Sequence, residues 1–126
     1  MLIADDHRLF AESLLAVLAE DDRVDVVGIA PNGVEAVQRA VELRPDVILM
    51  DIKMPLMDGL EATRRIRDAG LPTQVVLLTG GETGTDQDDA AKAGAVAFIR
   101  KERGVEEIRD VFLEVASLAA VLAPGQ

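Results

Sequence analysis

Apolar runs alternate with amphipathic stretches along the whole chain. The runs lie at residues 2–4, 24–30, 46–50, 74–79 and 95–99. Between and after them, apolar residues recur every three or four positions, which is the spacing of an amphipathic helix. The runs are mostly apolar rather than alternating, as in strands that are buried on both faces of a parallel sheet. The pattern therefore predicts an α/β fold: a doubly wound sheet of five parallel strands with helices on both faces.

Two of the predicted helices begin with clear local signals. Asn32 precedes a helical stretch, and Glu35 follows it by three residues, a spacing that favours a capped helix start. Asp58 and Gly59 are expected to start the helix that follows the third apolar run.

Two other helical segments depart from the amphipathic pattern. Residues 80–93 have almost no apolar side chains beyond three alanines, so the helix there is expected to be short or mobile. Residues 111–123 have more apolar side chains than an amphipathic helix needs, because only Glu114 and Ser117 are polar. One sheet face covers only part of such a helix, so we expect some of it to be exposed or shared with a partner.

Composition narrows the possible functions. The chain of 126 residues fits one domain, and its lack of cysteine and its single histidine exclude disulfides, thiolate metal sites and histidine-rich metal sites. No apolar run approaches the roughly 18 residues of a membrane span and no signal-peptide pattern is present, so we expect a cytoplasmic protein that does not contact membranes. The net charge of −10 argues against direct binding of nucleic acid.

Polar side chains that can bind ligands or react follow four of the apolar runs. They are Asp5 and Asp6 after the first run, Asp51 after the third, Thr79 at the end of the fourth and Lys101 after the fifth. The carboxyl ends of parallel strands share one edge of a sheet, so these groups are expected to converge. Carboxylates, a hydroxyl and an ammonium group at one edge can hold a divalent cation and a phosphoryl group.

The expected chemistry can be assigned by residue type. Asp6 and Asp51 can supply oxygen ligands to Mg²⁺, which prefers one or two carboxylates together with water and phosphoryl oxygens. Asp51 can then attack phosphorus to form an aspartyl phosphate. Lys101 offers a mobile positive charge to the phosphoryl oxygens, and Thr79 offers a hydroxyl.

Each of these side chains also has an ordinary structural alternative. The two acids after the first run could cap the following helix, and an aspartate at a strand end is commonly a turn residue. An isolated threonine or lysine would have no special role, and His7 is expected to be an exposed residue at the start of the first helix. It is the convergence of all the groups at one edge that favours the functional interpretation.

Three stretches together carry a resemblance to a known family. They are ADDHRLFAESL (4–14), DIKMPLMDGLEATRRI (51–66) and GAVAFIRK (94–101). With these motifs the whole chain resembles the receiver domain of bacterial two-component response regulators. The first two look like the subfamily with a C-terminal helix-turn-helix output domain (NarL/FixJ/LuxR-type). The resemblance implies a flavodoxin-like sheet with strand order 2-1-3-4-5.

The resemblance also implies a function for the predicted site. Asp51 would accept a phosphoryl group from a histidine kinase or from a small donor such as acetyl phosphate. Mg²⁺ would be held by Asp6, Asp51 and the backbone carbonyl of Lys53, with Asp5 as an acid behind these ligands.

A switch is implied as well. The hydroxyl of Thr79 would move toward the phosphoryl group while the ring of Phe98 rotates inward, a two-state element biased by the added charge. Glu102 follows Lys101 where many family members have proline, so the cis peptide common at that position is not assured.

The resemblance finally implies a domain organisation and partners. Residues 1–126 are expected to form a single receiver domain, and the final AVLAPGQ resembles the start of an interdomain linker, with no output DNA-binding domain in this chain. Phosphorylation would change association with a second copy or with an output domain through the last helix, and thereby regulate transcription. Such a chain would not turn over an external substrate as an enzyme does.

Two alternatives stay open from the residues. The polar segment 80–93 and the apolar last helix also suit a receiver-like module that associates without phosphorylation. A small α/β enzyme is disfavoured, because a dehalogenase-type phosphatase requires an Asp-x-Asp motif and a flavin carrier requires a hydroxyl- and glycine-rich phosphate loop.

Overall fold

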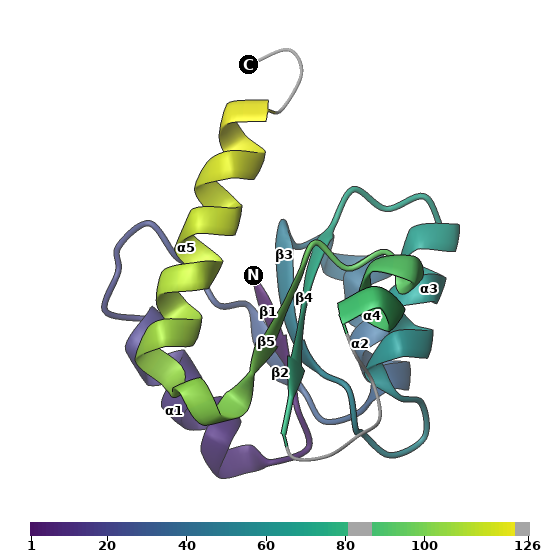
Figure 1. Ribbon diagram of the computed structural model, residues 1–126, viewed down its shortest axis with the longest axis horizontal. Helices are drawn as coiled ribbons and strands as arrows, with labels where there is room; N and C mark the ends of the chain where they lie inside the picture. Colours follow the sequence, from purple (N-terminus) through teal and green to yellow (C-terminus); the bar gives the residue numbers. More distant parts are fainter. Residues whose placement is uncertain (81–86, 123–126) are drawn as a thin grey trace.

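Five parallel strands form one sheet in the order β2-β1-β3-β4-β5, and helices lie on both sides of it (Figure 1). The computed structural model describes the backbone of residues 1–80 and 87–122, and the side chains of residues 1–80 and 87–117. The strands are β1 (Leu2–Ala4), β2 (Gly28–Ala30), β3 (Val47–Asp51), β4 (Gln74–Thr79) and β5 (Ala97–Arg100). The helices are α1 (Arg8–Leu18), α2 (Gly33–Leu43), α3 (Gly59–Asp68), α4 (Gln87–Ala93) and α5 (Val105–Leu122), and a 3-10 turn, η1 (Lys101–Arg103), precedes α5. The predicted fold class and strand order are confirmed.

Two hydrophobic cores cover the two faces of the sheet. Helices α1 and α5 lie on one face, and α2, α3 and α4 lie on the other (Figure 1). Successive side chains of a strand point to opposite faces, so Leu49 packs with the α1 and α5 core while Ile48 packs with the α2 and α3 core. Burying each such side chain contributes about 1.5–3 kcal/mol. This burial on both faces is the physical reason for the continuous apolar runs.

The second strand is shorter than predicted. The apolar run 24–30 predicts a strand, but only Gly28–Ala30 pairs with β1. The cause is the length of its neighbour, because β1 begins at Leu2 and offers no strand partner to the earlier residues. Val24 and Val26 pack against the α1 and α5 core instead. The run is also less buried than its sequence predicts, because only Ala30 is fully buried and Val27 is 46% exposed.

Both predicted helix starts are confirmed. Asn32 Oδ1 accepts the backbone N–H of Glu35 at 2.9 Å, and Asn32 Nδ2 donates to Glu35 Oε2 at 2.9 Å. Asp58 Oδ1 accepts the N–H of Glu61 at 2.8 Å at the start of α3. Each cap satisfies an N–H group that has no partner inside its helix and contributes about 1 kcal/mol.

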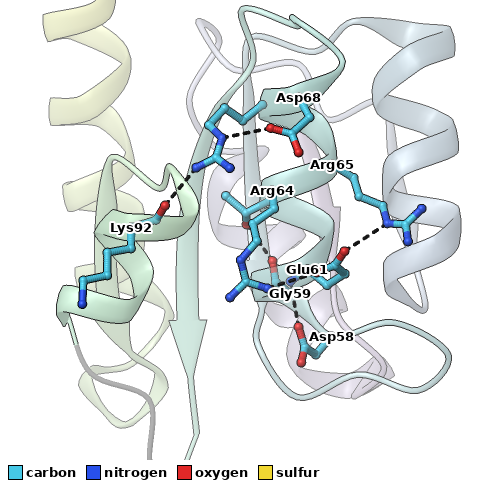
Figure 2. Close-up of polar contacts among 9 residues, drawn as sticks. Asp58, Gly59, Glu61, Arg64, Arg65, Asp68 and Lys92 are labelled. Carbon is cyan, nitrogen blue, oxygen red and sulfur yellow. Dashed lines mark hydrogen bonds and ion pairs between the residues drawn. The ribbon is translucent and has the colours of Figure 1, made fainter.

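Helix α4 is short, as predicted, with seven residues. The expectation of mobility falls mainly on residues 81–86, which lie outside the described part of the chain. The Arg67 side chain on α3 donates to the backbone carbonyl of Lys92 on α4 at 2.9 Å (Figure 2). Figure 2 also shows Glu61 accepting from Arg64 and Arg65 along α3. The short helix is thus tied to its neighbour by a hydrogen bond as well as by packing.

Helix α5 packs against α1 through its first turns. Ile108 and Phe112 are buried, and Val111, Leu113 and Val115 are partly buried against the same core. The last turns of the helix rise beyond the end of the sheet in Figure 1. The predicted surplus of apolar surface concerns residues 111–123, and the side chains from residue 118 onward lie outside the described part of the chain. Among the helices described, none combines the length and apolarity needed to cross a bilayer.

Candidate functional site

The carboxyl ends of three strands bring Asp5, Asp51 and Lys101 into contact. Asp5 follows β1, Asp51 ends β3, and Lys101 follows β5. Lys101 Nζ lies 2.6 Å from Asp5 Oδ2 and 3.2 Å from Asp51 Oδ2. The side chains of the two acids are 0% and 3% exposed and that of the lysine is 12% exposed. A largely buried lysine thus bridges two buried carboxylates at the predicted edge.

The stem of Lys101 is held by neighbours that the sequence did not indicate. The ammonium lies over the Phe10 ring at 4.5 Å from its centroid, which is within range of a cation–π contact. A Cβ on Gly80 would meet the lysine Cδ at 3.4 Å, so the chain after β4 passes close to the stem. Phe10 appears in the sequence as one more apolar position of a helix, so periodicity alone could not reveal this role.

The electrostatics of the site are unfavourable to a charged Asp51. Burial raises the pKa of the Asp51 carboxyl above its usual value, and the negative charge of Asp5 raises it further. The positive charge of Lys101 lowers the pKa and offsets these effects only in part. A second cation at this edge would therefore favour the ionised form of Asp51, which is the nucleophilic form.

Asp6 and His7 form the outer part of the site. Asp6 is 34% exposed and His7 is 67% exposed at the side chain. Nδ1 of His7 lies 3.3 Å from Asp5 Oδ1, 3.4 Å from Asp6 Oδ1 and 3.7 Å from Asp51 Oδ2. The prediction of an exposed helix-start residue is right about exposure and position, because His7 is the N-cap of α1. It missed the orientation of the ring toward the acids.

The donor set of this cluster fits a divalent cation. One ligand atom from each of Asp5, Asp6, His7 and Asp51 lies within 4.8 Å of the others. Asp5 Oδ2 is buried and, within the described residues, accepts no hydrogen bond, so the ion pair with Lys101 is what compensates its charge. Carboxylate oxygens are the ligands that Mg²⁺ prefers.

The remaining predicted residues lie at or near the same edge. Thr79 is buried at the end of β4, one position beyond Leu78, which is in register with Asp51. Phe98 lies in β5, partly buried against the α2 and α3 core. Lys53 has an exposed side chain and follows Ile52, whose N–H donates to Leu78 O at 3.0 Å. The peptide bond after Lys101 is trans, like the others in the described residues.

The loop from β3 to α3 turns tightly behind Asp51. The N–H of Gly59 donates to Ile52 O at 2.7 Å, and a Cβ on Gly59 would collide with the Asp51 carbonyl oxygen. Glycine is therefore required there for α3 to begin so close to the site. Leu56 in the same loop has φ of 69° and is 80% exposed. A branched apolar residue in this left-handed conformation is unusual and strained.

Comparison with known proteins gives a consistent family match. The family described as "Response regulator receiver domain" matches residues 1–112. The response regulator GacA of Pseudomonas viridiflava is 39% identical over 108 residues, which are 86% of this chain and 50% of that protein. The transcriptional regulatory protein LnrK of Bacillus subtilis is 33% identical over 124 residues, 98% of this chain and 56% of that protein. The chain thus spans about half the length of these curated relatives.

Solved structures show the same similarity. The receiver domain of the putative response regulator NarL from Mycobacterium tuberculosis superimposes with a TM-score of 0.82 at 33% identity, covering 92% of this chain and 94% of that one. The response regulator domain of Thermotoga maritima CheB gives a TM-score of 0.83 at 35% identity, covering 98% and 96%. Relatives from several subfamilies are similar to a comparable degree, so the comparisons identify a receiver domain without selecting the helix-turn-helix subfamily.

Proposed function

Because the chain belongs to the family of response regulator receiver domains, we propose that it is a phosphoacceptor signalling domain that takes a phosphoryl group on Asp51. The observation that carries the proposal is the contact of Lys101 with both Asp5 and Asp51 at the carboxyl ends of the strands. Receiver domains are signalling modules of two-component systems, so a histidine kinase is the proposed donor and turnover of an external substrate is not proposed.

The Asp51 carboxylate is the nucleophile in the proposed transfer. One carboxylate oxygen bonds to phosphorus as the bond from phosphorus to the donor breaks, and the donor leaves with the bonding electrons. The donor atom is a phosphohistidine nitrogen of a kinase or the acyl oxygen of acetyl phosphate. Lys101, already 3.2 Å from Asp51 Oδ2, can follow the new negative charge onto the phosphoryl oxygens.

Asp6, Asp51 and the backbone carbonyl of Lys53 are the residues proposed to hold Mg²⁺, with Asp5 behind them. The bound ion supplies charge neutralisation at the phosphoryl oxygens. This chain supplies the clustered carboxylates, and Asp5 keeps Lys101 in place at 2.6 Å.

Thr79 and Phe98 are proposed as the switch that responds to phosphorylation. Support comes from their placement, since Thr79 ends the strand beside Asp51 and Phe98 packs on the side of the sheet that carries α4. A new charge at Asp51 can attract the Thr79 hydroxyl, and the space vacated can admit the ring. Output is proposed through association of α5 with a second copy or an output domain, and the similarity to LnrK, a transcriptional regulatory protein, supports a role in regulating transcription.

Incubation with Mg²⁺ and acetyl phosphate, followed by intact mass spectrometry, tests the proposal. We expect one added phosphoryl group, lost in Asp51→Ala and retained in Asp46→Ala, an exposed aspartate that precedes β3. An adduct that survives Asp51→Ala, or no adduct in the unmodified chain, would contradict it. Association that does not change on phosphorylation would favour the phosphorylation-independent module instead.

A further inference from the structure

The one histidine of the chain lies where a metal ligand would lie. We propose that His7 Nδ1 is a direct ligand of the divalent cation at the Asp51 site, and that this nitrogen strengthens the preference of the site for first-row transition ions such as Ni²⁺ over Mg²⁺. The inference rests on the proposed cation site, and it adds a nitrogen ligand and a stronger selectivity than carboxylates alone provide.

The position of the ring is unexplained by its local role. His7 is the N-cap of α1, yet its side chain makes no capping hydrogen bond. Serine, threonine, aspartate or asparagine would satisfy the helix N–H groups there, and imidazole does not. The ring instead turns toward the three acids, although two thirds of its side chain is exposed and could face solvent.

The separations suit ligands of one ion. Adjacent ligands of an octahedral ion with bonds of about 2.1 Å lie roughly 3 Å apart. His7 Nδ1 lies 3.3, 3.4 and 3.7 Å from the nearest oxygens of Asp5, Asp6 and Asp51. With all four ligand atoms of the cluster within 4.8 Å of one another, these separations are of the size expected around one ion.

Neither neutral tautomer of His7 suits all of its neighbours when no cation is bound. Lys101 Nζ, which can only donate, lies 3.5 Å from Nδ1, so that contact favours a lone pair on the nitrogen. The carboxylate oxygens around the same atom favour a hydrogen on it. A cation placed among the acids and Nδ1 lets the nitrogen present its lone pair without repulsion.

The selectivity follows from ligand chemistry. Mg²⁺ prefers an all-oxygen environment, whereas imidazole suits Ni²⁺, Co²⁺ and Zn²⁺. Removal of His7 should therefore weaken transition-metal binding and leave Mg²⁺ binding nearly unchanged. Asp51 contributes to both, so its loss should weaken both ions together.

Calorimetric titration of the metal-free chain with NiCl₂ and with MgCl₂ tests the inference. For His7→Ala we expect Ni²⁺ affinity to fall by roughly tenfold or more. Loss of a residue that only hydrogen-bonds to a metal ligand already lowers metal affinity by about 10- to 100-fold, and loss of the ligand itself should cost at least as much. Mg²⁺ affinity should change by less than about twofold, because Mg²⁺ gains little from a nitrogen ligand. His7→Asn, which replaces the imidazole by an amide, should show the same loss of Ni²⁺ affinity. Circular dichroism of each variant checks that it folds.

A spectroscopic measurement gives an independent readout. Electron spin echo modulation of bound Mn²⁺ should show coupling to an imidazole nitrogen, which can only be that of His7, and the coupling should vanish in His7→Ala. Equal changes in Ni²⁺ and Mg²⁺ affinity, or no nitrogen coupling, would overturn the inference while Mg²⁺ binding and phosphorylation of Asp51 remained intact. Failure of the chain to bind either ion would instead overturn the proposed cation site itself.

Discussion

The inner and outer parts of the site differ sharply in solvent exposure, although Asp5 of the inner part and Asp6 of the outer part are adjacent in the sequence. Asp5, Asp51 and Lys101 form the inner part, and Asp6 and His7 form the outer part. Asp5 has no exposed side-chain surface, whereas Asp6 is 34% exposed. The inner part should therefore govern stability and the charge state of Asp51, and the outer part should govern what the site binds. The following predictions test that division, beginning with the largest effect.

Removal of the inner cation should have the largest effect. Lys101→Met removes the cation that bridges two buried carboxylates and should lower the free energy of unfolding at neutral pH by about 3 kcal/mol. Lys53→Met, which removes an exposed lysine near the site, should change it by less than about 0.5 kcal/mol. Urea unfolding without Mg²⁺ measures both. Equal effects of the two variants would show that Lys101 is not the compensating charge.

Neutralising Asp51 should stabilise the chain at neutral pH. Burial and the charge of Asp5 raise the Asp51 pKa above the ordinary 3.8, so the folded state binds this proton more tightly than the unfolded state. The resulting stabilisation is fully present below pH 3.8 and is lost as the pH rises through the raised folded pKa. Asp51→Asn should therefore be more stable than the unmodified chain at neutral pH, by about 1 kcal/mol.

Urea unfolding of Asp51→Asn and of the unmodified chain across pH 3 to 8 checks the predicted direction of this pH dependence. The stability advantage of Asp51→Asn should grow as the pH rises and should shrink when Mg²⁺ is added to both. Parallel stability curves would show that Asp51 does not carry the pH dependence.

Relief of backbone strain beside the site should give a smaller gain. Leu56→Gly removes the side chain that disfavours φ of 69°, and after the entropy cost of glycine we expect about 0.5–1 kcal/mol of added stability. Leu56→Ala keeps a Cβ and should keep most of the strain. Thermal unfolding of the two variants separates the backbone effect from loss of the exposed leucine side chain. A gain as large for alanine as for glycine would contradict the strain argument.

An outer acid should matter least for stability and most for binding. Asp6→Asn should change the free energy of unfolding by less than about 0.5 kcal/mol, because the side chain is partly solvated. The same variant should bind Mg²⁺ more weakly, because it loses a charged oxygen ligand. Calorimetry and urea unfolding on one sample measure the two effects. A loss of stability comparable to that in Lys101→Met would remove the distinction between the inner and outer parts.

Features of the fold that depend on local chemistry were predicted well. Asn32 and Asp58 begin their helices as expected, since capping depends on residues within three positions. The apolar runs at β3 and β4 predicted strands buried on both faces, because apolar side chains are the ones that folding buries. The gathering of Asp5, Asp51 and Lys101 was also foreseen, since parallel topology places every strand's carboxyl end at one edge.

Features that depend on distant neighbours were not. The length of β2 is set by how far β1 extends, and the residues of the run 24–30 do not indicate the length of their neighbour. Phe10 contacts Lys101, which is distant in the sequence, and Arg67 donates to the backbone of Lys92, but Phe10 and Arg67 each appear in the sequence as an ordinary helix residue.

His7 shows the limit most directly. The sequence by itself determined a five-stranded α/β receiver fold, its helix starts and the set of acids and lysine at the sheet edge, because these follow from periodicity, local capping and topology. The tertiary structure alone decided which way the imidazole points, which acid is buried and which side chains support the lysine. Those features are set by packing and electrostatics among residues that meet only when the chain is folded.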